Sequence, residues 1–161
     1  MADQETGSRR LAEFLLERRE LVLEKWVCVL KDDPQHTASK RLSPEEIRNH
    51  VGLLLEYLTG SLQNRADPEP KINTQATAAE HGRHRWAAGY RPEELILELS
   101  HLRAICIPHF FEFLERNPDI GAAGCITLSV TLHRLLDETM RSSVTEFLRA
   151  KQVATGSSGR E

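Results

Sequence analysis

The sequence has few of the features that mark membrane, secreted or nucleic-acid-binding proteins. Its 161 residues include only three cysteines and 6% aromatic residues, and no apolar run approaches the roughly 20 residues that cross a bilayer. The opening MADQETGSRR lacks the apolar centre of a secretory signal. A count of 21 Lys and Arg against 24 Asp and Glu gives a formal net charge of -3, which argues against a phosphate-backbone binder. We therefore expect a cytoplasmic protein with neither nucleic acid nor membrane as a partner.

Sequence signatures of catalysis and metal binding are also scarce. Neither a CxxC motif nor a Gly-rich phosphate loop is present, and Cys28, Cys106 and Cys125 are scattered through apolar helical sequence. They are expected to be reduced core thiols. Glu98-Leu99-Ser100-His101 matches one Glu-x-x-His element of a di-iron bundle, but the sequence contains no second one. We therefore expect no enzymatic activity, no metal and no cofactor.

Helical periodicity, by contrast, is present almost throughout the chain. The apolar spacing predicts an all-α fold, a single bundle of about five helices with a long helix at its C-terminal end. Ser43-Pro44-Glu45-Glu46 provides an N-cap, a first-turn proline and a capping-box acid. We expect one helical domain over residues 1–152 and a flexible tail or linker over 153–161. The predicted helices span residues 8–30, 43–62, 74–88, 92–116 and 117–152.

The segment 79–103 places charged side chains on helix faces that should be partly buried. His81 and Arg85 lie four residues apart on one face, Gly89 ends that helix, and Glu98 lies among apolar positions of the next. Buried charges need partners. We expect a structural network in which His81 and Arg85 contact Glu98 or Glu94, and we favour this interpretation over a ligand pocket.

The last predicted helix has an apolar rhythm of fours and threes that suits either a dimer seam or packing within one bundle. Histidines on this helix and its predecessor leave open a haem- or metal-binding sensor, although core or interface histidines are the favoured interpretation. Asp137, four residues after His133, is expected to orient it. The residues considered as ligands or as interface are His101, His109, His133, Asp137, Met140, Val144 and Phe147.

The pattern His81-x3-Arg85-x3-Gly89-Tyr90, followed by Glu98 and Leu102-Arg103, resembles the N-terminal domain of RsbRD-type proteins, the RsbT co-antagonist regulators. Versions of that domain also precede bacterial histidine kinases. The resemblance implies a cytoplasmic, non-enzymatic sensory domain that controls a downstream kinase or stress-response regulator, and it permits a globin-like fold without haem. Homodimerisation and helix repacking are the mechanism that we expect.

Overall fold

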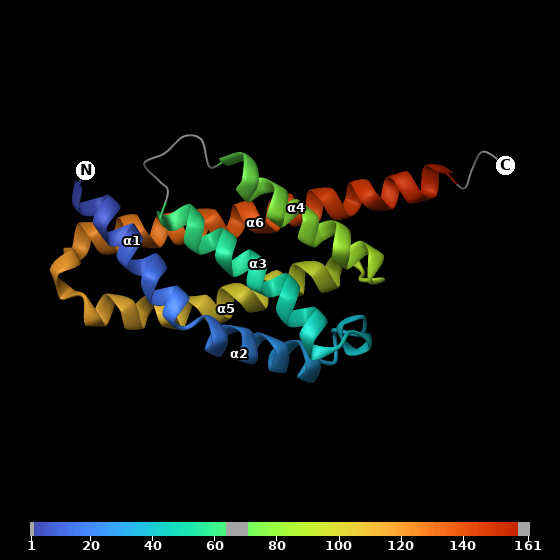
Figure 1. Cartoon of the computed structure of the whole chain (residues 1–161), viewed down its shortest axis with the longest axis horizontal. Helices are drawn as coiled ribbons and strands as arrows, with labels where there is room; N and C mark the ends of the chain where they lie inside the picture. Colours follow the sequence, from blue (N-terminus) through green and yellow to red (C-terminus); the bar gives the residue numbers. More distant parts are fainter. Residues whose placement is uncertain (1, 64–70, 158–161) are drawn as a thin grey trace.

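The computed structural model describes residues 2–63 and 71–157, and this part of the chain is helical without strands (Figure 1). The predicted all-α class with a long C-terminal helix is confirmed. None of the described helices is both long and apolar enough to span a membrane. The elements are α1 (Ala2–Glu17), α2 (Arg19–Asp32), η1 (Ser39–Arg41), α3 (Pro44–Gln63), α4 (Lys71–Ala87), α5 (Pro92–Arg116), η2 (Pro118–Ile120) and α6 (Gly121–Ser157).

Two helix ends have the local chemistry that the sequence predicts. At the start of α3, the Ser43 amide donates to Glu46 Oε2 and the Glu46 amide donates to Ser43 Oγ, which completes the capping box. At the end of α4, Gly89 has a φ of 76°, in the left-handed region where a Cβ would be strained. The Gly89 and Tyr90 amides donate to the carbonyls of Trp86 and Arg85, a Schellman motif that turns the chain into α5.

The prediction of one continuous helix over residues 8–30 is wrong, because α1 and α2 are separated at Arg18. This residue has φ -98° and ψ 7°, outside the helical region. Its guanidinium lies 3.5 Å from the Phe14 ring centroid and 2.8 Å from Glu112 on α5. The break lets α1 pack on α3 while α2 contacts both α3 and α5.

The last helix differs from its predicted limits at both ends. Pro118–Ile120 form the 3₁₀ turn η2, and α6 begins at Gly121, whose φ of 65° redirects the chain. The helix then continues to Ser157, past the expected end near Gln152. Its final turns project beyond the other helices (Figure 1). The division into a domain and a tail at residue 152 stays a prediction.

The most extensive helix contact joins α4 to α6. A Cβ built on Gly82 would lie 2.0 Å from the Ser143 carbonyl oxygen, so only glycine allows this approach. Ser143 Oγ donates to the Ala78 carbonyl at 2.7 Å, and the rings of Trp86 and Phe147 meet edge to face at 5.6 Å. We call this contact the α4–α6 seam; it is the main contact of α4 and is formed with the helix that ends the described chain.

The three cysteines are free thiols in different surroundings. Cys106 is buried, and burial raises the pKa of its thiol to about 12. Cys125 is partly buried, whereas Cys28 is exposed, so the expectation of a core position was wrong for Cys28. Cys28 follows the buried Trp26 by two residues, or roughly 200° of helix rotation, and so lies on the opposite face of α2.

Candidate functional site

A fully buried ion pair lies between α4 and α5. Arg85 Nη2 is 2.6 Å from Glu98 Oε1, and Arg85 Nε is 2.9 Å from Glu98 Oε2. The two side chains are 1% and 0% exposed. Burial alone lowers the pKa of Arg85, but the Glu98 carboxylate outweighs burial and the net shift is upward. The Arg85 guanidinium therefore stays charged, and Glu98 pairs with it through two-point hydrogen bonds in a buried site.

Two further residues of the predicted network surround this pair. His81 Nε2 lies 3.8 Å from Glu98 Oε1, and the Arg85 guanidinium lies 5.1 Å from the centroid of the Tyr90 ring. Burial, followed by the Glu98 charge, raises the pKa of the Tyr90 hydroxyl, which stays protonated. The structure thus brings His81, Arg85, Tyr90 and Glu98 together. The four side chains are buried, and the Arg85–Glu98 pair connects α4 to α5.

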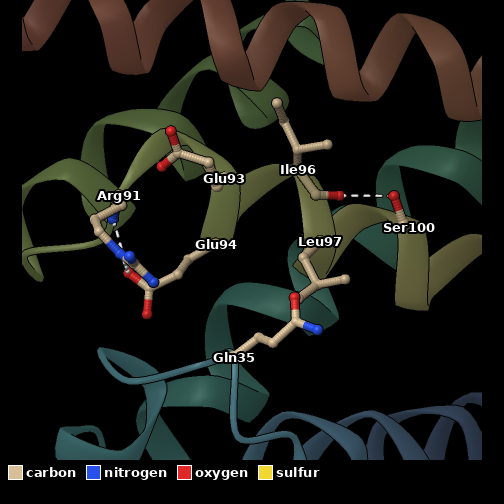
Figure 2. A pocket seen from close by; sticks show the side chains of 7 residues that line it. All are labelled: Gln35, Arg91, Glu93, Glu94, Ile96, Leu97 and Ser100. Carbon is tan, nitrogen blue, oxygen red and sulfur yellow. Dashed lines mark hydrogen bonds and ion pairs between the residues drawn. The ribbon is translucent and has the colours of Figure 1, made fainter.

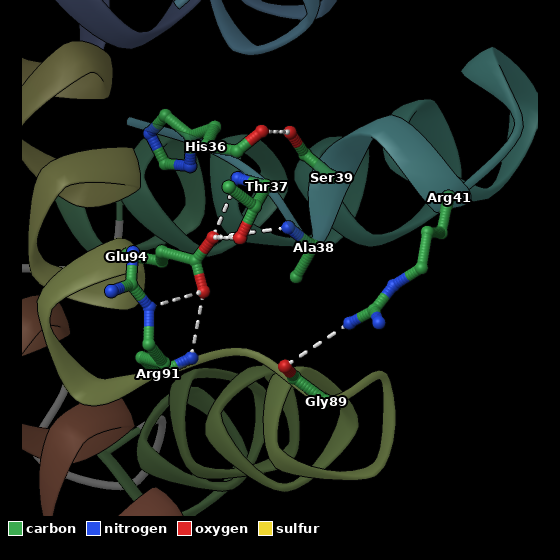
Figure 3. A network of polar contacts seen from close by, with 8 residues as sticks. All are labelled: His36, Thr37, Ala38, Ser39, Arg41, Gly89, Arg91 and Glu94. Carbon is green, nitrogen blue, oxygen red and sulfur yellow. Dashed lines mark hydrogen bonds and ion pairs between the residues drawn. The ribbon is translucent and has the colours of Figure 1, made fainter. Parts of the chain in front are cut away.

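Glu94 has a separate role one turn earlier on α5 (Figure 3). Its Oε1 accepts hydrogen bonds from the amides of Thr37 and Ala38 and from Thr37 Oγ1, while Oε2 accepts from the Arg91 amide and Nε. Burial raises the pKa of this carboxyl, but the donors outweigh burial and hold it at about 2. Glu94 therefore fastens the loop between α2 and α3 to the start of α5.

The same loop and α5 form a cluster that the sequence interpretation did not identify. His101 Nε2 lies 2.9 Å from Asp33 Oδ2, and the His101 ring is 5.5 Å from the His36 ring. One nitrogen or carboxylate oxygen from each of Asp33, His36 and His101 lies within 4.8 Å of the others. Hydrogen bonds from the Gln35 amide and from His101 lower the pKa of Asp33, and burial lowers the pKa of His36. Asp33-x2-His36 was the signal available in the sequence, but it lies in a polar loop where no periodicity predicts burial.

An open groove of about 520 Å³ lies along the first half of α5 (Figure 2). Gln35 and Ser100, the neighbours in sequence of His36 and His101, both line it. The groove combines polar and apolar groups and is shallow. Its full lining is Gln35, Arg91, Glu93, Glu94, Ile96, Leu97 and Ser100.

The remaining predicted residues are not part of either cluster. Arg103 forms an ion pair with Asp137 on α6, so Asp137 contacts Arg103 instead of fixing His133. His133 is exposed, so it is not a core histidine, and the alternative of an interface histidine stays a prediction. His109 Nδ1 lies 3.6 Å from Glu112 Oε2.

The apolar stripe predicted along α6 by the spacing of fours and threes does not keep to one face of the helix. Ile126 and Val130 are 66% and 54% exposed, whereas Phe147 is fully buried, and Met140 and Val144 are partly buried. A straight helix rotates by about 20° per heptad relative to a seven-residue repeat, so the pattern drifts by roughly 60° between Ile126 and Phe147. Its end lies in the intrachain core, and its beginning lies on the surface.

Comparison with known proteins identifies the family of the chain. Among curated proteins and among solved structures, no match is found. A family model, described as the RsbT co-antagonist protein RsbRD N-terminal domain, matches residues 20–161. The match includes both clusters and the α4–α6 seam and leaves out α1. This family is one of regulatory, sensory domains that act in stress-response partner switching. The chain belongs to the RsbRD N-terminal domain family.

Proposed function

We propose that this chain is a cytoplasmic, non-enzymatic input domain that controls a downstream signalling module through α6. That module is a histidine kinase or a stress-response regulator of the RsbT-linked type. The observation that carries the proposal is the α4–α6 seam, because it connects the buried Arg85–Glu98 pair to the helix whose last turns project from the bundle. A change in how α4 packs on α5 alters the contact that positions α6.

The tight packing at the α4–α6 seam supports a response in which α6 switches between distinct positions. Gly82 lies against the Ser143 backbone with no room for a Cβ, so α4 cannot shift toward α6 by small degrees. Packed interfaces of this kind move between alternative arrangements. A signal that alters the α4–α5 contact therefore biases the position of α6.

Hydrogen exchange tests this relay. Arg85→Lys keeps the charge but loses the two-point contact with Glu98, and we expect faster amide exchange over residues 143–157 as well as in α4 and α5. Arg10→Lys is the matched control, since Arg10 pairs with Asp119 near the surface at 2.6 Å. Faster exchange in α4 and α5 with unchanged α6 would refute the relay.

Dimerisation is the second part of the proposal. The exposed apolar residues Ile126 and Val130 on α6 support a contact with a second copy, whereas Phe147 packs on Trp86 and cannot also serve that contact. In sedimentation velocity we expect a dimer that Ile126→Asp with Val130→Asp converts to monomer. Leu21→Asp, at a 57% exposed site on α2, is the control. A monomeric wild-type chain, or an unchanged dimer in the double variant, would remove this part.

A haem- or metal-sensing role is the alternative function that the histidines left open. Haem ligation by His133 is disfavoured by its exposed position. The Asp33–His36–His101 cluster supports the metal form of the alternative. Of its three residues, the sequence analysis had considered only His101 as a ligand.

A further inference from the structure

The cluster of Asp33, His36 and His101 draws its side chains from two places in the fold. Asp33 follows the last turn of α2, His36 lies in the loop after it, and His101 is in the middle of α5. Their ligand-type atoms all lie within 4.8 Å of one another. Ligands of a tetrahedral ion with bonds of roughly 2.1 Å are separated by roughly 3.4 Å, so closing around an ion needs only side-chain rotation and a small loop adjustment.

His36 supplies an independent observation. It is 0% exposed, and neither ring nitrogen has a hydrogen-bond partner among the described residues. A buried polar group without a partner is costly, and native proteins rarely retain one without a reason. Its ring lies beside those of His101 and Tyr90, at 5.5 and 6.5 Å. The Tyr90 hydroxyl is protonated, and His101 contacts Asp33. Neither of these neighbours forms a hydrogen bond with the His36 nitrogens.

The loop that carries His36 is held in place by other contacts. Glu94 accepts the amides of Thr37 and Ala38, Ser39 Oγ donates to the His36 carbonyl at 3.2 Å, and Arg41 Nη2 donates to the Gly89 carbonyl at 3.3 Å (Figure 3). The backbone on the C-terminal side of His36 is therefore fixed, although its imidazole has no hydrogen bond. A preorganised backbone with a free ligand group is what a binding site requires.

We propose that Asp33, His36 and His101 bind one divalent transition-metal ion of the zinc class. Two imidazoles and one carboxylate suit Zn²⁺, Co²⁺, Ni²⁺ or Fe²⁺, whereas Mg²⁺ and Ca²⁺ prefer sites built from oxygen ligands. Asp33 supplies one negative charge, and a fourth ligand such as a water molecule would complete a tetrahedral site. This inference concerns binding and does not depend on the proposed relay through α6.

Metal titration of the untagged, chelator-treated chain tests the site. Zn²⁺ is titrated in competition with a chromophoric chelator, and Co²⁺ is followed by its visible absorption, which reports coordination by nitrogen and oxygen. We expect one equivalent of either ion to bind. Asp33→Asn and His101→Ala should each weaken affinity by about tenfold or more. His133→Ala, at an exposed histidine outside the cluster, should leave affinity unchanged.

The choice of variants keeps the test independent of folding. Asp33 and His101 are 17% and 24% exposed, so their substitutions are tolerated better than one at the buried His36, and circular dichroism verifies helicity for each variant. Absence of stoichiometric binding by the folded wild-type chain would overturn the inference. Binding that persists unchanged in Asp33→Asn and His101→Ala would place the ion elsewhere and would overturn it equally.

Discussion

The Arg85–Glu98 pair and the Asp33–His36–His101 cluster both gather buried polar groups against α5, yet they differ in how fully those groups are paired. Arg85 donates to both oxygens of Glu98, and the two charges cancel. In the cluster, Asp33 and His101 contact each other while both nitrogens of the buried His36 lack a hydrogen bond. Burial of polar groups is common to both, so burial alone does not distinguish a structural network from a binding site. Ligand atoms that have no hydrogen bond, such as the two His36 nitrogens, do distinguish them.

Arg85→Ala should cause the largest loss of stability of the variants considered. It tests the fully paired site of the comparison, the Arg85–Glu98 pair. The substitution leaves Glu98 buried without a partner, and we expect the free energy of unfolding to fall by about 3–5 kcal/mol. Urea denaturation measures this change.

The matched control for Arg85→Ala is Arg103→Ala. Arg103 pairs with Asp137 near the surface, with side chains 33% and 66% exposed, so its loss should cost about 1 kcal/mol or less. Equal effects of the two substitutions would show that the Arg85–Glu98 pair is not protected from solvent.

Acid should release the loop that carries His36 while the wild-type helices are still formed. The native pKa of Glu94 is about 2, against 4.5 for an ordinary glutamate. A lowered native pKa contributes stability that is present above pH 4.5 and is lost as the pH falls toward 2. The difference corresponds to about 3 kcal/mol.

Comparison of the wild-type chain with Glu94→Gln isolates the stability that the ionised Glu94 carboxylate contributes. We expect the variant to be less stable by about 3 kcal/mol at pH 7 and the gap to close between roughly pH 4.5 and pH 2. Unfolding followed by circular dichroism at each pH provides the measurement. A gap that is constant over this range would mean that Glu94 is not held ionised by the loop donors.

His36→Leu should have the smallest effect on stability. It tests the incompletely paired site of the comparison, the Asp33–His36–His101 cluster. Replacing a buried imidazole that has no hydrogen bonds by an apolar side chain removes unpaired polar atoms, so in the presence of a chelator we expect a change within about 1 kcal/mol. Stabilisation by added Zn²⁺ should be lost in the same variant. A large loss of stability without metal would indicate that the His36 nitrogens are satisfied in solution.

Much of the fold was accessible from the sequence because its signals are local. The capping box at Ser43 and the glycine turn at Gly89 act within a few residues, and each appears where it was expected. The apolar spacing likewise predicted the helical class, although the stripe along α6 drifts from the surface into the core. Charged residues on a core-facing edge also pointed to the contact between Arg85 and Glu98, since such groups need partners.

The features that were missed depend on contacts between distant parts of the chain. Arg18 is neither proline nor glycine, and the helix breaks there beside Phe14 and Glu112. His36 lies in a polar loop, and contacts of this loop with distant residues, among them Glu94 on α5, accompany its burial. No periodicity in the sequence records either arrangement.

In the proposed relay, the glycine contact between α4 and α6 is a pivot, and the C-terminal part of α6 is a long lever arm. From Ser143 to Ser157 the helix extends roughly 21 Å at 1.5 Å per residue, and its last turns project past the bundle. A tilt of roughly 5° about that pivot would move the far end by roughly 2 Å, on the scale of the 1–2 Å helix shifts seen in switching proteins. In the proposed relay, a displacement too small to disturb the core is thus magnified at the projecting end of α6.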